Sequence, residues 1–148
     1  MNDGTMKPIL LAAAFFDAIE RKDWAALERM LDEGFIYQGP LPDPVGKDVW
    51  MSFQKAVQAA FPDWDYHLSK LEVLNGSVRA TVSITGTHTQ ELAIPWKGIK
   101  KLPPTGKKVT MPQEHALLKM QEGKIIGLKV EPSSHGSLPG LLSQLGLE

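Results

Sequence analysis

The chain has 148 residues, 43% of them hydrophobic, and its 16 Lys and Arg residues against 17 Asp and Glu residues give a formal net charge of −1. This length suits one domain over residues 1–148 that buries a core and encloses a pocket. The nearly balanced charge provides no field to hold a nucleic-acid backbone, so we expect no nucleic-acid partner. Because there is no cysteine, disulfides and thiolate chemistry are excluded, which suits a cytoplasmic protein.

The apolar run over residues 9–16 has the length of the hydrophobic part of a signal peptide. Asp17, Glu20 and Arg21 follow where small residues would mark a cleavage site, and the run is too short to cross a bilayer. Its apolar residues recur every three or four positions, which predicts a helix over 6–21 with one buried face. We therefore expect no contact with a membrane.

Two more helices are predicted in the first half of the chain. Asp23 can cap the first of them, which we expect to end at Gly34, and the second covers 47–60. Residues 35–38 between them have the pattern of a short strand. Residues 41–46 are predicted to form a loop, because their prolines have no N–H to donate to a sheet.

From Trp64 onward, apolar and polar residues alternate, which predicts strands. The alternation changes phase near Lys70 and indicates a bulge there. Asn75-Gly76 predicts a tight hairpin, since both residues tolerate the positive φ that such a turn requires. The returning strand is expected to reach His88, and residues 90–102 then form an irregular excursion.

The segment Pro103-Pro104-Thr105-Gly106 predicts a turn, because proline fixes φ and glycine adopts positive φ without steric cost. A strand over 107–120 should follow, with a break at Pro112, and an antiparallel strand over 124–131 should return beside it. Residues 138–145 are expected to form a short helix. Helices followed by antiparallel strands favour an α+β domain in which the helices cover one face of a curved sheet.

Several short segments occur in a fixed order along most of the chain, after the N-terminal helix pair. They are Phe61-Pro62-Asp63, Gly86-Thr87-His88-Thr89, Pro103-Pro104-Thr105-Gly106-Lys107, Glu122-Gly123-Lys124-Ile125 and Leu141-Leu142-Ser143-Gln144-Leu145-Gly146. In this order they resemble the SnoaL-like polyketide cyclase, or ester cyclase, family of the nuclear-transport-factor-2-like superfamily.

The resemblance implies a cone-shaped α+β fold, with N-terminal helices packed in a strongly curved, mainly antiparallel sheet and an apolar pocket at the wide end. It also implies a homodimer formed through the sheet face. The founding cyclases close a polyketide ester by an intramolecular aldol reaction without a cofactor, using an acidic residue as general acid and base with a histidine nearby. That acidic residue is an aspartate late in the chain, whereas no aspartate here follows Asp65. An equivalent role falls to Glu114, Glu122 or Glu131, with His88 or His115.

Glu114 is the leading candidate for the catalytic base. On an unbroken strand it shares a face with Ala116 and Leu118, which should point into the core. Burial there takes water away from the carboxylate and suits it to general acid–base catalysis. The alternative is that Pro112 shifts the register, so that Glu114 points outward and His115 points into the pocket.

His115 and His88 are candidates for polarising a substrate carbonyl. His88 ends a strand on its apolar face and would lie at the mouth of the pocket, or else serve a structural role by bonding to a backbone carbonyl. Four aromatic residues are candidates for the pocket wall or its lid, although most aromatic residues in a chain of this size belong to the core. They are Tyr37, Trp50, Phe53 and Trp96.

No spacing of histidines and carboxylates typical of a metal site occurs, and glycine-rich cofactor motifs are absent, so we expect neither a metal nor a cofactor. The leading hypothesis is a protein that binds an apolar, carbonyl-bearing small molecule and removes a proton next to the carbonyl, which leads to cyclisation or isomerisation. The first alternative is a non-catalytic ligand-binding or dimeric scaffold protein. The second is hydrolysis of an epoxide or ester through an activated water.

Overall fold

The structure is a computed structural model that describes residues 3–39, 43–95, 100–131 and 136–146. Within these ranges the chain begins with two helices and ends with a β-hairpin followed by a helix. The helices are α1 Asp3–Glu20, α2 Trp24–Met30, α3 Lys47–Ala60 and α4 Ser137–Gln144. The strands are β1 Leu31–Gln38, β2 Val45–Gly46, β3 Lys70–Leu74, β4 Ser77–Val82, β5 Thr85–Thr87, β6 Lys108–Thr110, β7 Glu114–Gln121 and β8 Lys124–Val130.

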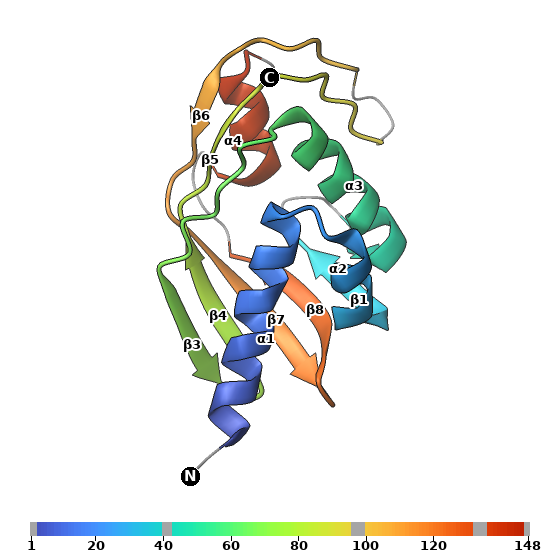
Figure 1. Ribbon diagram of the computed structural model, residues 1–148, viewed down its shortest axis with the longest axis vertical. Helices are drawn as coiled ribbons and strands as arrows, with labels where there is room; N and C mark the ends of the chain where they lie inside the picture. The colour runs from blue at the N-terminus through green and yellow to red at the C-terminus, as the bar shows by residue number, and fades with distance from the viewer. Residues whose placement is uncertain (1–2, 40–42, 96–99, 132–135, 147–148) are drawn as a thin grey trace.

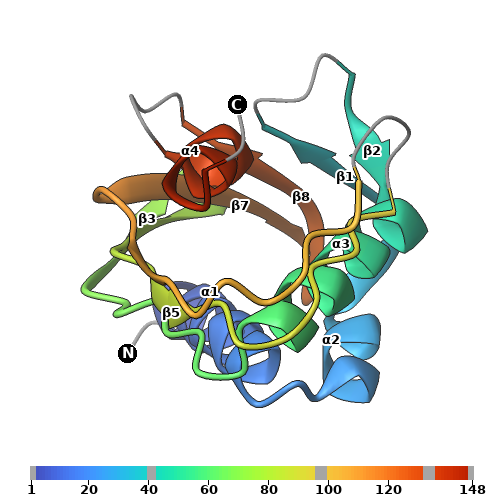
Figure 2. The same ribbon diagram turned by 90° about the horizontal axis from the view of Figure 1, so that it is seen from above.

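The main sheet has six strands in the order β2-β1-β8-β7-β4-β3. All neighbouring strands are antiparallel except β1 and β8, which are parallel. Figures 1 and 2 show the sheet curving around α1 and α3, which cover the same face, while α4 lies at one end of the molecule, where it is bonded to β6. The mainly antiparallel, curved α+β architecture predicted from the sequence is therefore confirmed.

The core lies between this face of the sheet and the two long helices. The rings of Phe15 in α1 and Trp50 in α3 stack with their centroids 5.6 Å apart, and Phe35 of β1 packs against the same indole at 5.3 Å. All three side chains are at most 2% exposed. These rings join both helices to the sheet, and α3 has the bounds that the sequence predicted.

The second helix is shorter than predicted. Asp23 caps it as expected, since its carboxylate accepts the N–H of the residue three positions on at 3.1 Å. The chain then becomes extended at Leu31 rather than at Gly34. Leu31 is fully buried beside Ile125 of β8, and its carbonyl accepts a hydrogen bond of 3.0 Å from the buried Lys47. Contacts with distant parts of the chain thus override the local helical pattern.

The bulge predicted near the start of β3 lies a few residues earlier. The carbonyl of Tyr66 accepts the N–H of Ser83 at 2.8 Å, and the N–H of Ser69 donates to the carbonyl of Thr81 at 3.0 Å. Between these two bonds the chain advances by three residues from Tyr66 to Ser69, but by only two residues from Thr81 to Ser83. His67 lies between these bonds with φ 46, so the left-handed conformation of this residue absorbs the extra position.

The turn at Asn75-Gly76 has the geometry predicted from the sequence, and the turn at Glu122-Gly123 has the same one. Asn75 and Gly76 have φ values of 44 and 81, and Glu122 and Gly123 have values of 51 and 80. Positive φ at both central residues matches the right-handed twist of the flanking strands. The first turn joins β3 to β4, whose register is regular from the turn onward. The second joins β7 to β8, whose register shifts between Met120 and Lys119, just beyond the turn.

The strand predicted to reach His88 and the strand predicted over 107–120 each divide into two pieces at the same level. The main sheet ends at the pair Val82 and Glu114, and a separate ladder of β5 with β6 begins at the pair Thr85 and Thr110. The break in the second strand includes Pro112, as the sequence predicted. Glu114 therefore lies where the small sheet diverges from the main one.

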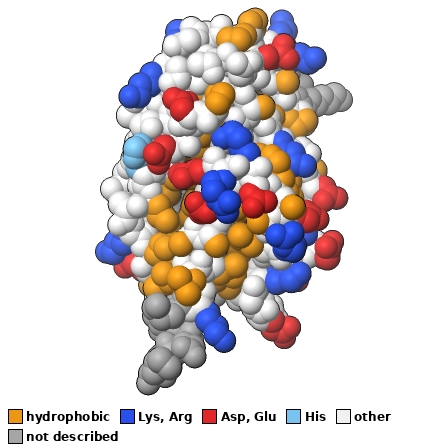
Figure 3. All heavy atoms as spheres, viewed as in Figure 1, with side chains coloured by type: hydrophobic (Ala, Val, Ile, Leu, Met, Phe, Trp, Pro, Cys, Tyr) orange, Lys and Arg blue, Asp and Glu red, His pale blue; other side chains and the backbone are white. Residues whose placement is uncertain are grey.

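Hydrophobic side chains also reach the surface. Figure 3 shows them gathered on the lower part of the face seen in Figure 1, over α1 and β3. Leu10 of α1 and Leu74 of β3 are 60% and 45% exposed. Within the described ranges, no helix combines the length and the apolar character needed to cross a membrane.

Candidate functional site

A cavity of about 170 Å³, partly open to the outside, lies between the sheet, α1, α3 and α4. Its wall is mostly aromatic and aliphatic, with a few polar side chains. The aromatic members are Phe15, Phe16, Tyr37, Trp50, Phe53, Trp64 and Tyr66, and the aliphatic and sulfur-containing members are Val57, Val82, Ile84, Met111, Ala116, Leu128, Val130 and Leu141. Gln54, Glu114 and His115 complete the wall.

Glu114 is the carboxylate of this cavity, and its side chain points inward. It is 4% exposed and opens β7 opposite Val82, on the same face as the buried Ala116 and Leu118. The break at Pro112 therefore does not reverse the register of the strand. A carboxylate in an apolar wall is one arrangement that supports general acid–base chemistry.

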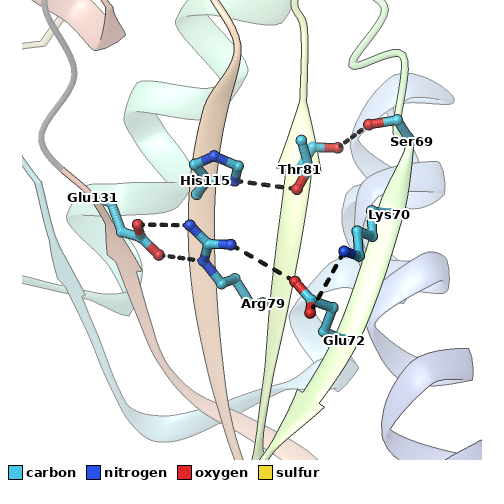
Figure 4. A network of polar contacts seen from close by, with 7 residues as sticks. All are labelled: Ser69, Lys70, Glu72, Arg79, Thr81, His115 and Glu131. Atoms are coloured by element: carbon cyan, nitrogen blue, oxygen red, sulfur yellow. Dashed lines mark hydrogen bonds and ion pairs between the residues drawn. The ribbon is translucent and has the colours of Figure 1, made fainter.

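His115 belongs to the cavity wall, but its ring lies on the other face of the sheet. Figure 4 shows the imidazole in front of the strands, with the helices behind them, beside Thr81, Arg79 and Glu131. Its Nδ1 atom lies 3.1 Å from the hydroxyl oxygen of Thr81. The imidazole thus points away from Glu114, and the two side chains do not form an acid–base pair inside the cavity.

Glu131, another carboxylate considered for the catalytic role, does not line the cavity and is bound to Arg79 instead. Its carboxylate accepts two hydrogen bonds from Arg79, at 2.7 and 3.1 Å, and Arg79 also lies 3.6 Å from Glu72. The hydrogen bond from Arg79 lowers the pKa of the Glu131 carboxyl below its ordinary value. These residues form a polar strip on the outer face of the sheet, with both signs of charge interleaved (Figure 4).

His88 is not among the residues that line the cavity, which corrects the expectation of a place at its mouth. The ring is fully buried and stacks on Phe61 with 5.3 Å between centroids. Its Nδ1 atom accepts the backbone N–H of Thr105 at 3.2 Å and lies 2.9 Å from the hydroxyl of the same residue. The structural alternative is therefore the better interpretation, with the imidazole holding the turn before β6.

Burial lowers the pKa of His88 below 6.5, its ordinary value in an unfolded chain, although the carbonyl of Gln90 acts in the opposite direction. The unfolded chain then binds a proton more readily than the folded one, so the free energy of unfolding should fall as the pH drops below about 6.5. In His88→Asn, whose side-chain oxygen can still accept the N–H of Thr105, this part of the pH dependence should be absent. Urea unfolding between about pH 7 and pH 5.5 measures the difference. The exposed His67→Asn serves as the control, and equal slopes for wild type and His88→Asn would contradict the expectation.

Three of the four aromatic candidates, Tyr37, Trp50 and Phe53, line the cavity. The fourth, Trp96, lies outside the described residues. Tyr37 is the most polar of them, and burial, followed by the negative charge of Glu114, raises the pKa of its phenol to about 12. Its hydroxyl therefore keeps its proton at neutral pH and remains a hydrogen-bond donor.

Some residues that line the cavity were not among the site residues predicted from the sequence. Gln54 follows Trp50 by one turn of α3, so helical spacing alone could have found it. Leu141 had no such signal, because it comes from α4 at the far end of the chain. The amide of Gln144 holds that helix by bonding both the N–H and the carbonyl of Thr110, at 3.0 and 2.9 Å.

Metal ligands are not grouped in this part of the molecule. Among the described residues, no set of three or more His, Cys, Asp or Glu side chains is placed to hold a metal ion.

Comparisons with known proteins agree with this architecture. The model of the SnoaL-like polyketide cyclase family matches residues 9–131. A search of curated proteins gave no match. Among solved structures, AclR of Streptomyces galilaeus, whose provisional description is that of a hydroxylase, superposes with a TM-score of 0.76 and 17% identity over 97% of this chain and 84% of its own.

Two further structures have the same fold. A protein of Jannaschia sp. CCS1 with a provisional description as a SnoaL-like polyketide cyclase gives a TM-score of 0.74 and 16% identity over 96% of this chain and 94% of its own. IdmH of Streptomyces antibioticus superposes with a TM-score of 0.70 and 20% identity, over 95% of this chain and 99% of its own. At these identities the likeness establishes the fold, whereas the family follows from the match over residues 9–131. The chain belongs to the SnoaL-like polyketide cyclase family and has its nuclear-transport-factor-2-like fold.

Proposed function

We propose that the cavity binds an apolar, carbonyl-bearing small molecule and that Glu114 removes a proton from the carbon next to the carbonyl. The observation that carries this proposal is the position of Glu114, which is 4% exposed in a wall that is otherwise mostly aromatic and aliphatic. A base held in such a wall has few competing water molecules around it. The enolate formed in this way leads to ring closure or to movement of a double bond.

The chemistry needs a bound substrate and a base placed beside the bond that breaks. Aromatic walls provide apolar contact with a planar molecule, and Glu114 provides the proton acceptor at the junction of the two sheets. Neither His88 nor His115 is placed to polarise the carbonyl from inside the cavity. The histidine part of the sequence-based hypothesis is therefore not retained in the proposal.

The proposal is tested with 2-tetralone, a planar bicyclic ketone with acidic C–H bonds next to its carbonyl. In D₂O, the wild-type protein should speed the exchange of these hydrogens for deuterium, which proton NMR follows as the loss of their signals. Addition of 2-naphthol, which has the ring skeleton of the 2-tetralone enol, should slow the exchange by competition. Exchange at the rate of buffer alone, with 2-tetralone bound, would contradict the proposal.

That outcome would favour the alternative, a binding protein without catalytic activity. One observation supports the alternative, namely that the Nδ1 atom of His115 lies within hydrogen-bond distance of Thr81 on the outer face of the sheet, so this candidate histidine does not face a ligand in the cavity. The names of the solved relatives do not decide between the two, since one is described as a hydroxylase and another as a cyclase.

The proposal includes a homodimer formed through the outer face of the sheet. The polar strip of this face alternates in charge, so a second copy turned by a two-fold rotation can pair its cations with the anions of the first. Sedimentation should give a dimer for the wild type, and Arg79→Glu, which places a third negative charge beside Glu72 and Glu131, should shift it to the monomer. A wild-type monomer at all concentrations would exclude this arrangement. The cytoplasmic location stays a prediction from the sequence.

A further inference from the structure

The register of the sheet places Tyr37 and Glu114 on the same face with one strand between them. Tyr37 of β1 is paired with Leu128 of β8, and Ala116 of β7 is paired with Val130 of the same strand. Glu114 precedes Ala116 by two positions and therefore shares its face. Leu128 is paired in turn with Leu118, so Glu114 lies about 10 Å across the sheet from Tyr37 and about 13 Å further along it. The ring of Tyr37 lies against Gly39 and so reaches along the sheet toward Glu114.

This spacing leaves room for a flat molecule between the two polar groups. Leu128 and Val130 of the intervening strand line the cavity together with Tyr37 and Glu114. A substrate that lies over Leu128 and Val130 has the carboxylate on one side and the phenol on the other. The two ends of an H–C–C=O unit can then be contacted at the same time, the hydrogen by one group and the oxygen by the other.

The position of the Tyr37 phenol depends on Gly39. A Cβ atom at residue 39 would lie 2.6 Å from Cζ of Tyr37 and closer still to its hydroxyl oxygen, whereas real Cβ atoms essentially never come within 3.0 Å of a neighbouring atom. The ring therefore lies over a stretch of backbone where any other residue would displace it. Gly39 is not in the left-handed region, so alanine is compatible with the backbone there and the conflict is with the phenol.

Tyr66 is the other phenol in the wall, but it is more enclosed. Its ring packs edge-on against Phe16, with centroids 4.9 Å apart, and against Trp64 at 6.1 Å, and the residue is 7% exposed. Tyr37 is only partly buried and lies at the end of β1. The phenol of Tyr37 is thus the one that the packing leaves open to a ligand.

We propose that Tyr37 is a catalytic hydrogen-bond donor whose hydroxyl binds the carbonyl oxygen of the substrate, and that Gly39 is the positioning residue that holds this hydroxyl in place. The inference rests on the proposed function, because it concerns the same substrate and the same step. It adds the group that stabilises the negative charge formed on the carbonyl oxygen in that step.

The step balances without another reactant. The C–H bond breaks and its proton moves to a carboxylate oxygen of Glu114, while the electron pair of that bond forms the C=C bond of the enolate. The π pair of the C=O bond moves to the oxygen, which becomes an oxyanion. Tyr37 keeps its proton and donates a hydrogen bond to this oxygen, and the bond strengthens as the negative charge develops. Return of the proton at another carbon, or attack of the enolate on a second carbonyl, completes the reaction.

Deuterium exchange into 2-tetralone tests the inference. Tyr37→Phe should lower kcat for exchange by about 100-fold with little change in KM, because one donor to the oxyanion is removed. Gly39→Ala should lower kcat by about 10- to 100-fold, because the hydroxyl is displaced but not deleted. Gly46→Ala, on the paired strand β2, is the matched control, since a Cβ there meets nothing within 4 Å.

The double variant separates positioning from a general structural effect. If Gly39 acts through the hydroxyl, then Gly39→Ala in the Tyr37→Phe background should cause no further loss of rate. A loss that multiplies with that of Tyr37→Phe would mean that Gly39 has a separate structural role, and it would overturn this part of the inference.

Binding of 2-naphthol gives a readout that does not depend on turnover. In Glu114→Gln, which mimics the protonated carboxyl, Tyr37→Phe should weaken 2-naphthol binding about tenfold, as expected for the loss of one hydrogen bond in an apolar site. If Tyr37→Phe exchanges deuterium at the wild-type rate while Glu114→Gln does not, the inference is wrong and the proposed function stands. If the wild type does not speed deuterium exchange, the proposed function fails. In that case, equal 2-naphthol affinities of Glu114→Gln and of the double variant Glu114→Gln with Tyr37→Phe would also exclude Tyr37 as a hydrogen-bond donor.

Discussion

Replacement of Glu114 by glutamine is expected to lower the rate of deuterium exchange into 2-tetralone by a factor of about 10² to 10⁴, the usual contribution of a positioned general base. Glutamine keeps the size and shape of the side chain but cannot accept the proton. Among the described residues of the cavity wall, Glu114 is the one carboxylate, so no neighbour there can replace it. Proton NMR in D₂O gives the rate for both proteins under the same conditions.

A matched control comes from the same hairpin. Glu122 lies exposed in the turn between β7 and β8, away from the cavity wall, and Glu122→Gln removes the same charge. This variant should exchange deuterium at the wild-type rate. A wild-type rate for Glu114→Gln, with its fold shown intact by circular dichroism, would mean that the carboxylate is not the base.

The largest effect on stability is expected for Trp50→Ala. Trp50 is 2% exposed and lies between the rings of Phe15 and Phe35, at 5.6 and 5.3 Å. Its removal deletes the apolar contact that joins α3 to α1 and to β1, and it enlarges the existing cavity. The expected loss is about 3–5 kcal/mol of the free energy of unfolding, as for other buried aromatic residues.

Urea unfolding measures this loss, with Val49→Ala as the control. Val49 is the preceding residue of the same helix but is 41% exposed, so its truncation should change the free energy of unfolding by no more than about 0.5 kcal/mol. A loss below about 1 kcal/mol for Trp50→Ala would show that the indole does not support the core.

The local pattern of the sequence predicts the elements whose structure depends on nearby residues. The helix over 47–60 and the turns at Asn75-Gly76 and Glu122-Gly123 follow from helical periodicity and from the conformations that these residue types tolerate. The inward direction of Glu114 follows in the same way from alternation along one strand. These features need no knowledge of distant contacts.

Features that depend on distant partners were not predictable from the same patterns. Leu31 looks like the end of a helix in its own segment, but pairing with Ile125 and a hydrogen bond from Lys47 make it part of a strand. The alternation along its strand places His88 on the apolar face, as expected for a pocket residue, but in the folded chain its ring is bound by the backbone of Thr105. Periodicity identifies which face a side chain shares, whereas the neighbour that it meets there depends on the folded chain.

The parallel pairing of β1 with β8 has a consequence for how the chain acquires its structure. β1 lies near the N-terminal end, and the strand beside it is the last one of the chain, so their contact closes a loop that contains most of the molecule. Contacts between such distant segments form slowly, because the entropy of the intervening chain must be lost first. During synthesis, the buried sides of α1, α3 and β1 therefore stay without the middle of their sheet until β8 has left the ribosome, and the cavity cannot form before then, because Leu128 and Val130 of β8 are part of its wall.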